Sequence, residues 1–145
     1  MNPALVFTLL ISQAQAYTTF FSQCPATVDT IPVFFTSLYT GRWYEISRDM
    51  DTPFEWMSDC VTATYTAEAD SLIGVNNRSW NWWTFFNYQT ALGKAKCSNE
   101  GKCYVTFNAL DTNYDNTNYN YNILMTDYVS YSVVYSCAPA WLWTS

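Results

Sequence analysis

The chain has 145 residues, of which 19% are aromatic and only 12% are charged, and it contains twelve acidic residues, six basic residues and no histidine. This length allows one domain. The lack of histidine excludes His-ligated haem, most zinc chemistry and every nucleophile that histidine activates. The net charge of −6 makes nucleic acid a poor partner. An aromatic content of 19% is more than an exposed surface tolerates, so these side chains must fill a core, line a cavity or sit at an interface.

The first sixteen residues have the features of a secretory signal peptide. Ala4 to Ile11 is an almost unbroken apolar run, and the small-x-small sequence Ala14-Gln15-Ala16 follows it. A signal peptidase recognises such an ending, and the run is too short to span a bilayer. A buried N-terminal strand or helix is the alternative. We expect a signal peptide at 1–16, a single mature domain at 17–145, and a secreted, extracellular protein that is not a membrane protein.

Short runs of β-branched and aromatic residues recur along the rest of the chain, and polar turns separate them. This pattern indicates an all-β barrel or sandwich. The expected strands are 43–48, 60–66, 72–77, 85–96, 102–110, 119–126, 130–137 and 141–143. The connections are short, so successive strands are expected to be neighbours. Eight strands that close on themselves leave room for one small ligand, but composition alone does not separate a barrel from a sandwich.

Two motifs favour the barrel. Gly41-Arg42-Trp43-Tyr44-Glu45-Ile46 combines a glycine that permits a sharp turn into a strand with a tryptophan that buries a large ring. In Thr126-Asp127-Tyr128 the carboxylate can cap backbone donors of a tight turn, so Asp127 is expected to be a turn residue and not a catalytic acid. With Cys24 before the first motif and Cys137 after the second, this order resembles the lipocalin family. Within that family it is most similar to apolipoprotein D, the bilin-binding proteins and the retinol-binding proteins.

The resemblance implies an eight-stranded up-and-down antiparallel β-barrel. It implies a closed barrel floor built from both motifs, with the residues Gly41, Trp43, Thr126, Asp127 and Tyr128. It also implies a disulfide between Cys24 and Cys137. The stretch from Asp70 to Asn87 matches the family only loosely.

The C-terminal segment departs from the family pattern. Lipocalins usually carry an arginine that packs over the tryptophan of the first motif, whereas this sequence ends at Trp141-Leu142-Trp143-Thr144-Ser145 without it. The helix that normally follows is missing, the last strand is short, and the tail cysteine that would pair with Cys60 in similar relatives does not occur. Either the chain is a truncated product or its lineage lost the tail. We expect an unpaired Cys60 and a dimer formed through Cys60 or through the open barrel seam.

A second disulfide is predicted between Cys97 and Cys103. Five residues with a turn-forming Asn and Gly separate the two cysteines, and their flanks have the character of the two arms of a hairpin. Opposed positions on antiparallel strands bring the Cα atoms within bridging range.

Alternation along the strands, with the family's parity for the later ones, predicts which side chains face the barrel interior. These candidate cavity residues are Val61, Ala63, Tyr65, Val105, Phe107, Tyr121, Ile123, Met125 and Val134. They are core positions by default and touch a ligand only where the barrel is not filled. Phe54, Trp56 and Met57 lie on the expected entry loop, where they either line the entrance or fold back as packing. Asn77 begins an N-glycosylation sequon in an expected loop, so the protein is a candidate glycoprotein.

These features favour a carrier of a small hydrophobic molecule, such as a fatty acid, sterol, retinoid or pigment, with no cofactor and no metal. The alternative is a secreted interaction protein with a filled barrel and binding loops that are rich in Trp and Tyr. An enzyme that isomerises lipids is the least favoured class. Its only candidate nucleophile is Cys60, which lies on the polar side of its strand and is expected to face outward. The protein is therefore expected not to be an enzyme.

Overall fold

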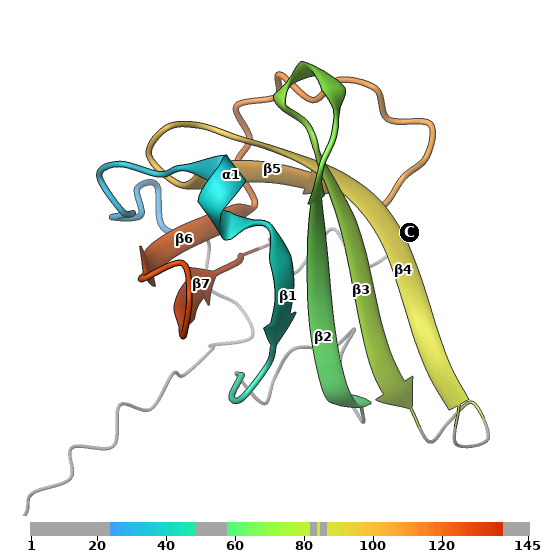
Figure 1. Cartoon of the computed structure of the whole chain (residues 1–145). Helices are drawn as coiled ribbons and strands as arrows, with labels where there is room; N and C mark the ends of the chain where they lie inside the picture. The colour runs from blue at the N-terminus through green and yellow to red at the C-terminus, as the bar shows by residue number, and fades with distance from the viewer. Residues whose placement is uncertain (1–23, 49–57, 82–83, 85–86, 138–145) are drawn as a thin grey trace, which may run out of the picture.

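The computed structural model describes residues 24–48, 58–81, 84 and 87–137. Within these residues, seven antiparallel strands form one sheet in which each strand pairs with the next along the chain. The strands are β1 (Gly41–Tyr44), β2 (Ser58–Ala67), β3 (Ile73–Asn81), β4 (Asn87–Cys97), β5 (Lys102–Thr106), β6 (Tyr121–Thr126) and β7 (Ser132–Tyr135). The sheet curls into a half-barrel (Figure 1). The all-β fold with up-and-down strand order is therefore confirmed, and the expected eighth strand at 141–143 lies outside the described residues.

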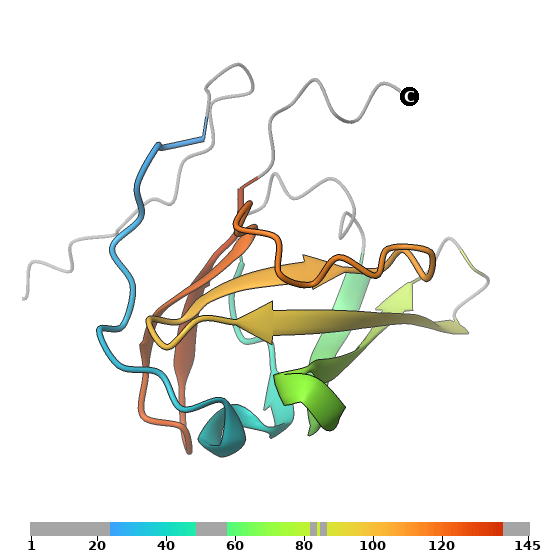
Figure 2. The same ribbon diagram turned by 90° about the horizontal axis from the view of Figure 1, so that it is seen from above.

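Two short helical segments lie wholly within the described residues, namely α1 (Thr36–Tyr39) and the 3-10 turn η1 (Ala69–Ser71), which joins β2 to β3. Figure 2 shows α1 at the end of the curled sheet where β4 turns into β5. Neither segment, in the part of the chain that the structure describes, has the length and apolar character that a membrane-crossing helix needs.

The three longest strands, β2, β3 and β4, form the wall of the half-barrel. Val75 of β3 pairs with Tyr65 of β2 on one side and with Gly93 of β4 on the other. Residues that pair directly across antiparallel strands share a face, and successive residues alternate between faces. We call the face that carries Tyr65, Val75 and the buried Ala95 the inner face, and the opposite side the outer face. The alternation in β2 therefore places its threonines at 62, 64 and 66 on the outer face.

The hydrophobic core lies on the inner face at the end nearest α1. Its buried members are Phe34, Tyr39, Tyr65, Ile73, Val75, Ala95, Cys103 and Ile123. The segment before α1 covers this end because its backbone is anchored to the sheet. The Phe34 amide donates to the Asn99 carbonyl at 2.7 Å, and the Ile31 amide donates to the Ile123 carbonyl at 3.0 Å.

Several strand boundaries differ from the expected ones for local reasons. β5 ends at Thr106, not at Leu110, because the Thr106 hydroxyl accepts a hydrogen bond from the Asn108 amide and the Asn108 side chain accepts one from the Leu110 amide. Such side-chain turns compete with strand pairing. β3 continues to Asn81 because its register with β4 is unbroken over its whole length.

Two disulfides are present, and they join the pairs expected from the sequence. Cys24 and Cys137, with Cα atoms 5.8 Å apart, link the N-terminal segment to the residues after β7. Cys97 and Cys103 occupy directly opposed positions on β4 and β5. Cys60 is free and exposed.

Candidate ligand-binding face

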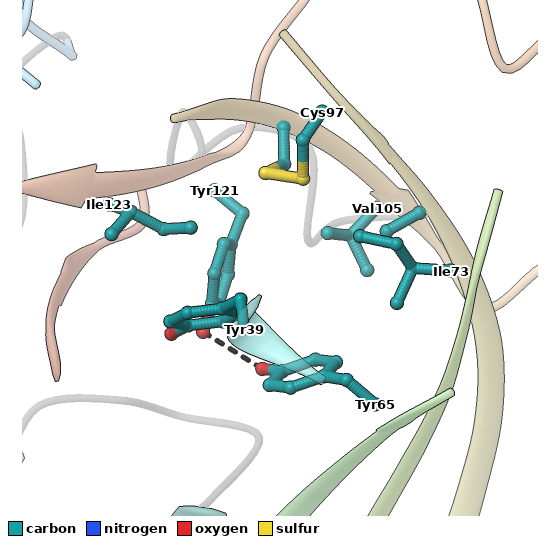
Figure 3. Close-up of a pocket in the computed structure, with 9 residues that line it drawn as sticks. Tyr39, Tyr65, Ile73, Cys97, Val105, Tyr121 and Ile123 are labelled. Atoms are coloured by element: carbon teal, nitrogen blue, oxygen red, sulfur yellow. Dashed lines mark hydrogen bonds between the residues drawn. A yellow bond between two sulfur atoms is a disulfide. The ribbon is translucent and has the colours of Figure 1, made fainter. Parts of the chain in front are cut away.

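The end of the inner face nearest α1 is closed by aromatic rings, which we call the tyrosine floor (Tyr39, Tyr65 and Tyr121). The ring centroids of Tyr39 and Tyr65 lie 5.4 Å apart, and Trp43 stacks on Tyr39 with centroids 5.0 Å apart. The hydroxyls of Tyr65 and Tyr121 share a hydrogen bond of 2.9 Å (Figure 3). The Tyr39 hydroxyl pairs with that of Ser132 at 2.8 Å. Rings from α1, β2 and β6 thus meet in one hydrogen-bonded layer.

The tyrosine floor is electrically neutral. Burial raises the pKa of Tyr39, of Tyr65 and of Tyr121 above the ordinary phenol value, because the charged phenolate loses its hydration there. All three hydroxyls therefore stay protonated at physiological pH. Among the described residues, no group of three or more His, Cys, Asp or Glu side chains is placed to hold a metal ion.

Almost no space remains within the floor. The cavity at this end has a volume of about 10 Å³, which is room for a single water molecule. Its walls are formed by Tyr39, Tyr65, Ile73, Ala95, Cys97, Cys103, Val105, Tyr121 and Ile123 (Figure 3). A ligand on the inner face must therefore lie beyond the tyrosine floor, on the side away from α1.

The next row of the inner face away from α1 has a different character. Asn77 of β3 pairs with Ala63 of β2 and with Ala91 of β4. It lies two residues beyond Val75 on an unbroken strand, so its side chain is on the inner face. Its Oδ1 atom is buried and accepts no hydrogen bond from the residues that the structure describes. A buried amide oxygen thus stands between two alanines, in a row that Trp43 of β1 continues through its pairing with Ala63.

Comparison with known proteins identifies the family of this chain. The sequence matches the Lipocalin-like domain over residues 36–143, which is well over half of the chain. The chain belongs to the lipocalin family. Family members generally bind small hydrophobic ligands inside the barrel.

Two known proteins are similar to this lipocalin. The Lazarillo protein of Schistocerca americana is 36% identical over 109 residues, which cover 72% of this chain and 47% of that protein. The chain therefore spans about half the length of this curated relative. The crystal structure of Per a 4, a major allergen from cockroaches, matches with a TM-score of 0.61 at 21% identity. That match covers 79% of this chain and 66% of the allergen, and it supports the fold alone.

The first floor motif of this lipocalin connects α1 directly to the sheet. Gly41 begins β1 with a φ of +121°, a backbone conformation that glycine adopts without steric cost. This turn lets Trp43 lie back over Tyr39, and the indole Nε1 donates a hydrogen bond of 3.0 Å to the Tyr39 carbonyl. Trp43 is only partly buried because its ring forms the outer layer of the floor.

The second floor motif forms the turn between β6 and β7. The Asp127 carboxylate accepts hydrogen bonds from the Ser130 hydroxyl and from the backbone amides of residues 129–131. These donors hold the pKa of Asp127 well below its usual range. The ring of Tyr128 stacks on Phe34 with centroids 6.0 Å apart, and its hydroxyl accepts a hydrogen bond from the Phe35 amide. Both motifs therefore meet at the α1 end of the half-barrel.

The structure brings part of the predicted cavity set together around the floor. Tyr65 and Ile123 are buried in the core, and Ala63, Val105 and Tyr121 pack against it. Val61 is partly buried farther along β2. Most of these residues form the tyrosine floor and the wall of the half-barrel. Ala63 pairs directly with Asn77.

The other three predicted cavity residues are exposed. The interior prediction for Met125 is wrong: Ile123 pairs with Val134 but Met125 pairs with Val133, so a bulge reverses the alternation of β6 at this point. Phe107 keeps the inner parity but follows the end of β5, and its ring lies against Gly93. Val134 also keeps its parity but stands on β7, which has a partner on one side only in the described sheet.

Asn77 was missed as an inner-face residue because it starts a sequon. The expected loop is wrong, since Asn77 lies in the middle of β3 and a glycan on it would project into the half-barrel. The signal that could have found it is the alternation Ile73, Val75, Asn77, which continues the inner face. The predicted entry-loop residues Phe54, Trp56 and Met57 lie outside the described residues.

Proposed function

We propose that this lipocalin binds a small hydrophobic molecule on the inner face, beyond the tyrosine floor, with a donor group of the ligand on Asn77. The observation that carries the proposal is the buried, unpaired Oδ1 atom between Ala63 and Ala91. A buried acceptor without a partner costs about 1–3 kcal/mol. A ligand hydroxyl or N–H placed there removes that cost, whereas the surrounding methyl groups favour an apolar body. The proposal includes no catalytic step.

The test uses matched ligand pairs that differ by one hydroxyl, namely cholesterol with cholest-5-ene and 1-hexadecanol with hexadecane. Binding is followed by intrinsic Trp fluorescence. We expect the hydroxylated member to bind about tenfold more tightly, which corresponds to about 1.4 kcal/mol. The difference should vanish in Asn77→Leu. Asn76→Leu is the matched control, because Asn76 is the neighbouring exposed amide on the outer face.

Two results would contradict the proposal. If none of the four compounds binds, the barrel is filled and the protein acts through its surface, as an interaction protein. If the hydroxyl preference persists in Asn77→Leu, the ligand's polar group lies elsewhere on the inner face.

We further propose that the protein is secreted after removal of residues 1–16. The two disulfides support this proposal, because such bonds persist in oxidising compartments. Expression in secreting eukaryotic cells should yield protein in the medium whose N-terminal residue is Tyr17, as determined by N-terminal sequencing. Retention of Met1, or protein that stays in the cytosol, would contradict it.

Cys60 is proposed to form an intermolecular disulfide in the secreted protein. The other four cysteines are paired, and the Cys60 side chain is exposed at the start of β2. An exposed thiol in an oxidising compartment reacts with a second thiol. Non-reducing electrophoresis should show a covalent dimer that Cys60→Ser abolishes. A wild-type protein that stays monomeric and has no free thiol after unfolding would disprove this expectation.

A further inference from the structure

The connection between β5 and β6 does not extend away from the half-barrel but folds back over the outer face of β4 and β5. Tyr104 and Lys96 pair directly across these strands and lie on the outer face, since their neighbours Cys103 and Ala95 are buried on the inner face. The Tyr104 hydroxyl donates to the Asp111 carboxylate at 2.6 Å. Figure 2 shows this connection, in orange, running beside β5 on the side away from α1.

Local hydrogen bonds hold the folded-back loop in one conformation. The Asp111 side chain accepts from the Asn113 amide at 3.0 Å, and the Asn116 side chain accepts from the Asn118 amide at 2.8 Å. At the end of the loop, the Asn120 side chain bonds to both the amide and the carbonyl of Val105, at 2.9 and 2.8 Å. A loop that is ordered before binding loses little conformational entropy when it binds.

A second hollow lies between this loop and the β4–β5 turn. It has a volume of about 120 Å³, far more than the cavity at the tyrosine floor. Its lining residues include Lys96, Ser98, Tyr114, Asp115, Asn116 and Tyr119, and we call it the loop pocket. Cys97, which also lines the cavity at the tyrosine floor, completes this lining. Lys96 lies on the outer face and Asn77 on the inner face, so a molecule in the loop pocket and a ligand at Asn77 would bind to opposite faces of the sheet.

The chemistry of the loop pocket fits a neutral ligand with several hydroxyl groups. Its two charges neutralise each other, since the Lys96 Nζ atom lies 2.6 Å from an Asp115 carboxylate oxygen. The Asn116 side chain is already hydrogen-bonded to the Tyr104 hydroxyl, whereas the phenols of Tyr114 and Tyr119 make no hydrogen bond within the described part of the chain that competes for a ligand. These groups provide both donors and acceptors. The tyrosine rings also provide faces for apolar C–H edges.

We propose that the loop pocket binds one monosaccharide unit. The loop pocket is open to solvent and has a volume of about 120 Å³, which is enough to receive the edge of one pyranose ring. The alternating hydroxyls and C–H groups of a sugar match a pocket whose polar groups are interleaved with tyrosine rings. The sugar is either free or the terminal residue of a glycan, and both present the same atoms.

Saturation-transfer NMR with methyl glycosides of glucose, galactose, mannose and N-acetylglucosamine tests the proposal on the full folded chain. At least one glycoside should show transfer. Its affinity should fall about tenfold in the double variant Tyr114→Ala, Tyr119→Ala. The matched control is Tyr88→Ala, which removes an exposed tyrosine of β4 outside the pocket. Asp115→Asn, which breaks the ion pair but leaves the rings in place, should also weaken binding. Circular dichroism checks that each variant is folded.

A glycan array measured in parallel distinguishes a free sugar from the terminal residue of a glycan. If the ligand is a glycan, the array spots that bind the protein should share one terminal residue. Transfer should persist in Asn77→Leu, so failure of this proposal and failure of inner-face binding are separable. The proposal is overturned if no glycoside shows transfer, or if Tyr88→Ala reduces binding as much as the double variant does. If the double variant does not fold, the test depends on Asp115→Asn, and unchanged glycoside binding in that variant overturns the proposal.

Discussion

Removal of the Cys24–Cys137 disulfide, by the double substitution Cys24→Ser, Cys137→Ser, is expected to lower the free energy of unfolding by about 4–5 kcal/mol. The bridge joins residues that are 113 positions apart in the chain. In the chain-entropy model, closing so long a loop restricts the unfolded state strongly. The expected loss is a large part of the total stability of a small domain, which is about 5–15 kcal/mol. Urea unfolding followed by circular dichroism measures it.

Two variants calibrate that result. Cys60→Ser removes a thiol that forms no bridge within the chain, so it should leave the free energy of unfolding of the monomer almost unchanged. Removal of Cys97–Cys103 by Cys97→Ser, Cys103→Ser, a bridge with a sequence separation of 6, should cost about 2 kcal/mol by the same model. A loss under 1 kcal/mol for the long bridge would show that the N-terminal segment is held by its backbone hydrogen bonds and not by the disulfide.

Trp43→Ala is expected to lower the free energy of unfolding by about 3 kcal/mol, the low end of the range for a buried tryptophan, because the ring is only partly covered. The substitution removes the stacking on Tyr39 and the hydrogen bond from the indole to the Tyr39 carbonyl. Tyr44→Ala is the control, since Tyr44 is the next residue of β1 and 65% exposed. It should change the free energy of unfolding by much less.

Ligand affinity separates a floor role from a binding role for this tryptophan. Folded Trp43→Ala protein should bind the inner-face ligand as tightly as the wild type, because the indole is stacked on Tyr39 and hydrogen-bonded to its carbonyl, even though Trp43 pairs with Ala63 in the cross-strand row that contains Asn77. A variant that keeps its stability but loses its ligand would show that the indole contacts the ligand directly.

Features that depend on short-range patterns were predictable from the sequence. The spacing of Cys97 and Cys103 around a turn correctly predicted their disulfide. The alternation along β2 correctly predicted that Ala63 and Tyr65 lie on the inner face. The antiparallel order of neighbouring strands followed from the short connections between them. Each of these depends on residues that are close in the chain, where periodicity and turn chemistry decide the outcome.

Features that depend on tertiary contacts were not predictable. A single bulge in β6 moves Met125 off the inner face, and nothing in the sequence around it marks that position. The path of the connection between β5 and β6 over the outer face depends on Tyr104 and Lys96 meeting Asp111 and Asp115. The sequon at Asn77 suggested a surface site, whereas burial in β3 depends on pairing with two other strands.

For the proposed inner-face ligand, the tyrosine floor is a stop at the bottom of the half-barrel, and it therefore sets how far such a ligand can enter. The stop is rigid, because its rings are joined by hydrogen bonds among Tyr39, Tyr65, Tyr121 and Ser132. It is also insensitive to pH across the physiological range, because burial raises the pKa of its phenols. In a homologous series of ligands, each added methylene deepens insertion until the chain reaches the stop. Beyond that length every further carbon must remain in water, and the gain in affinity per methylene ends abruptly.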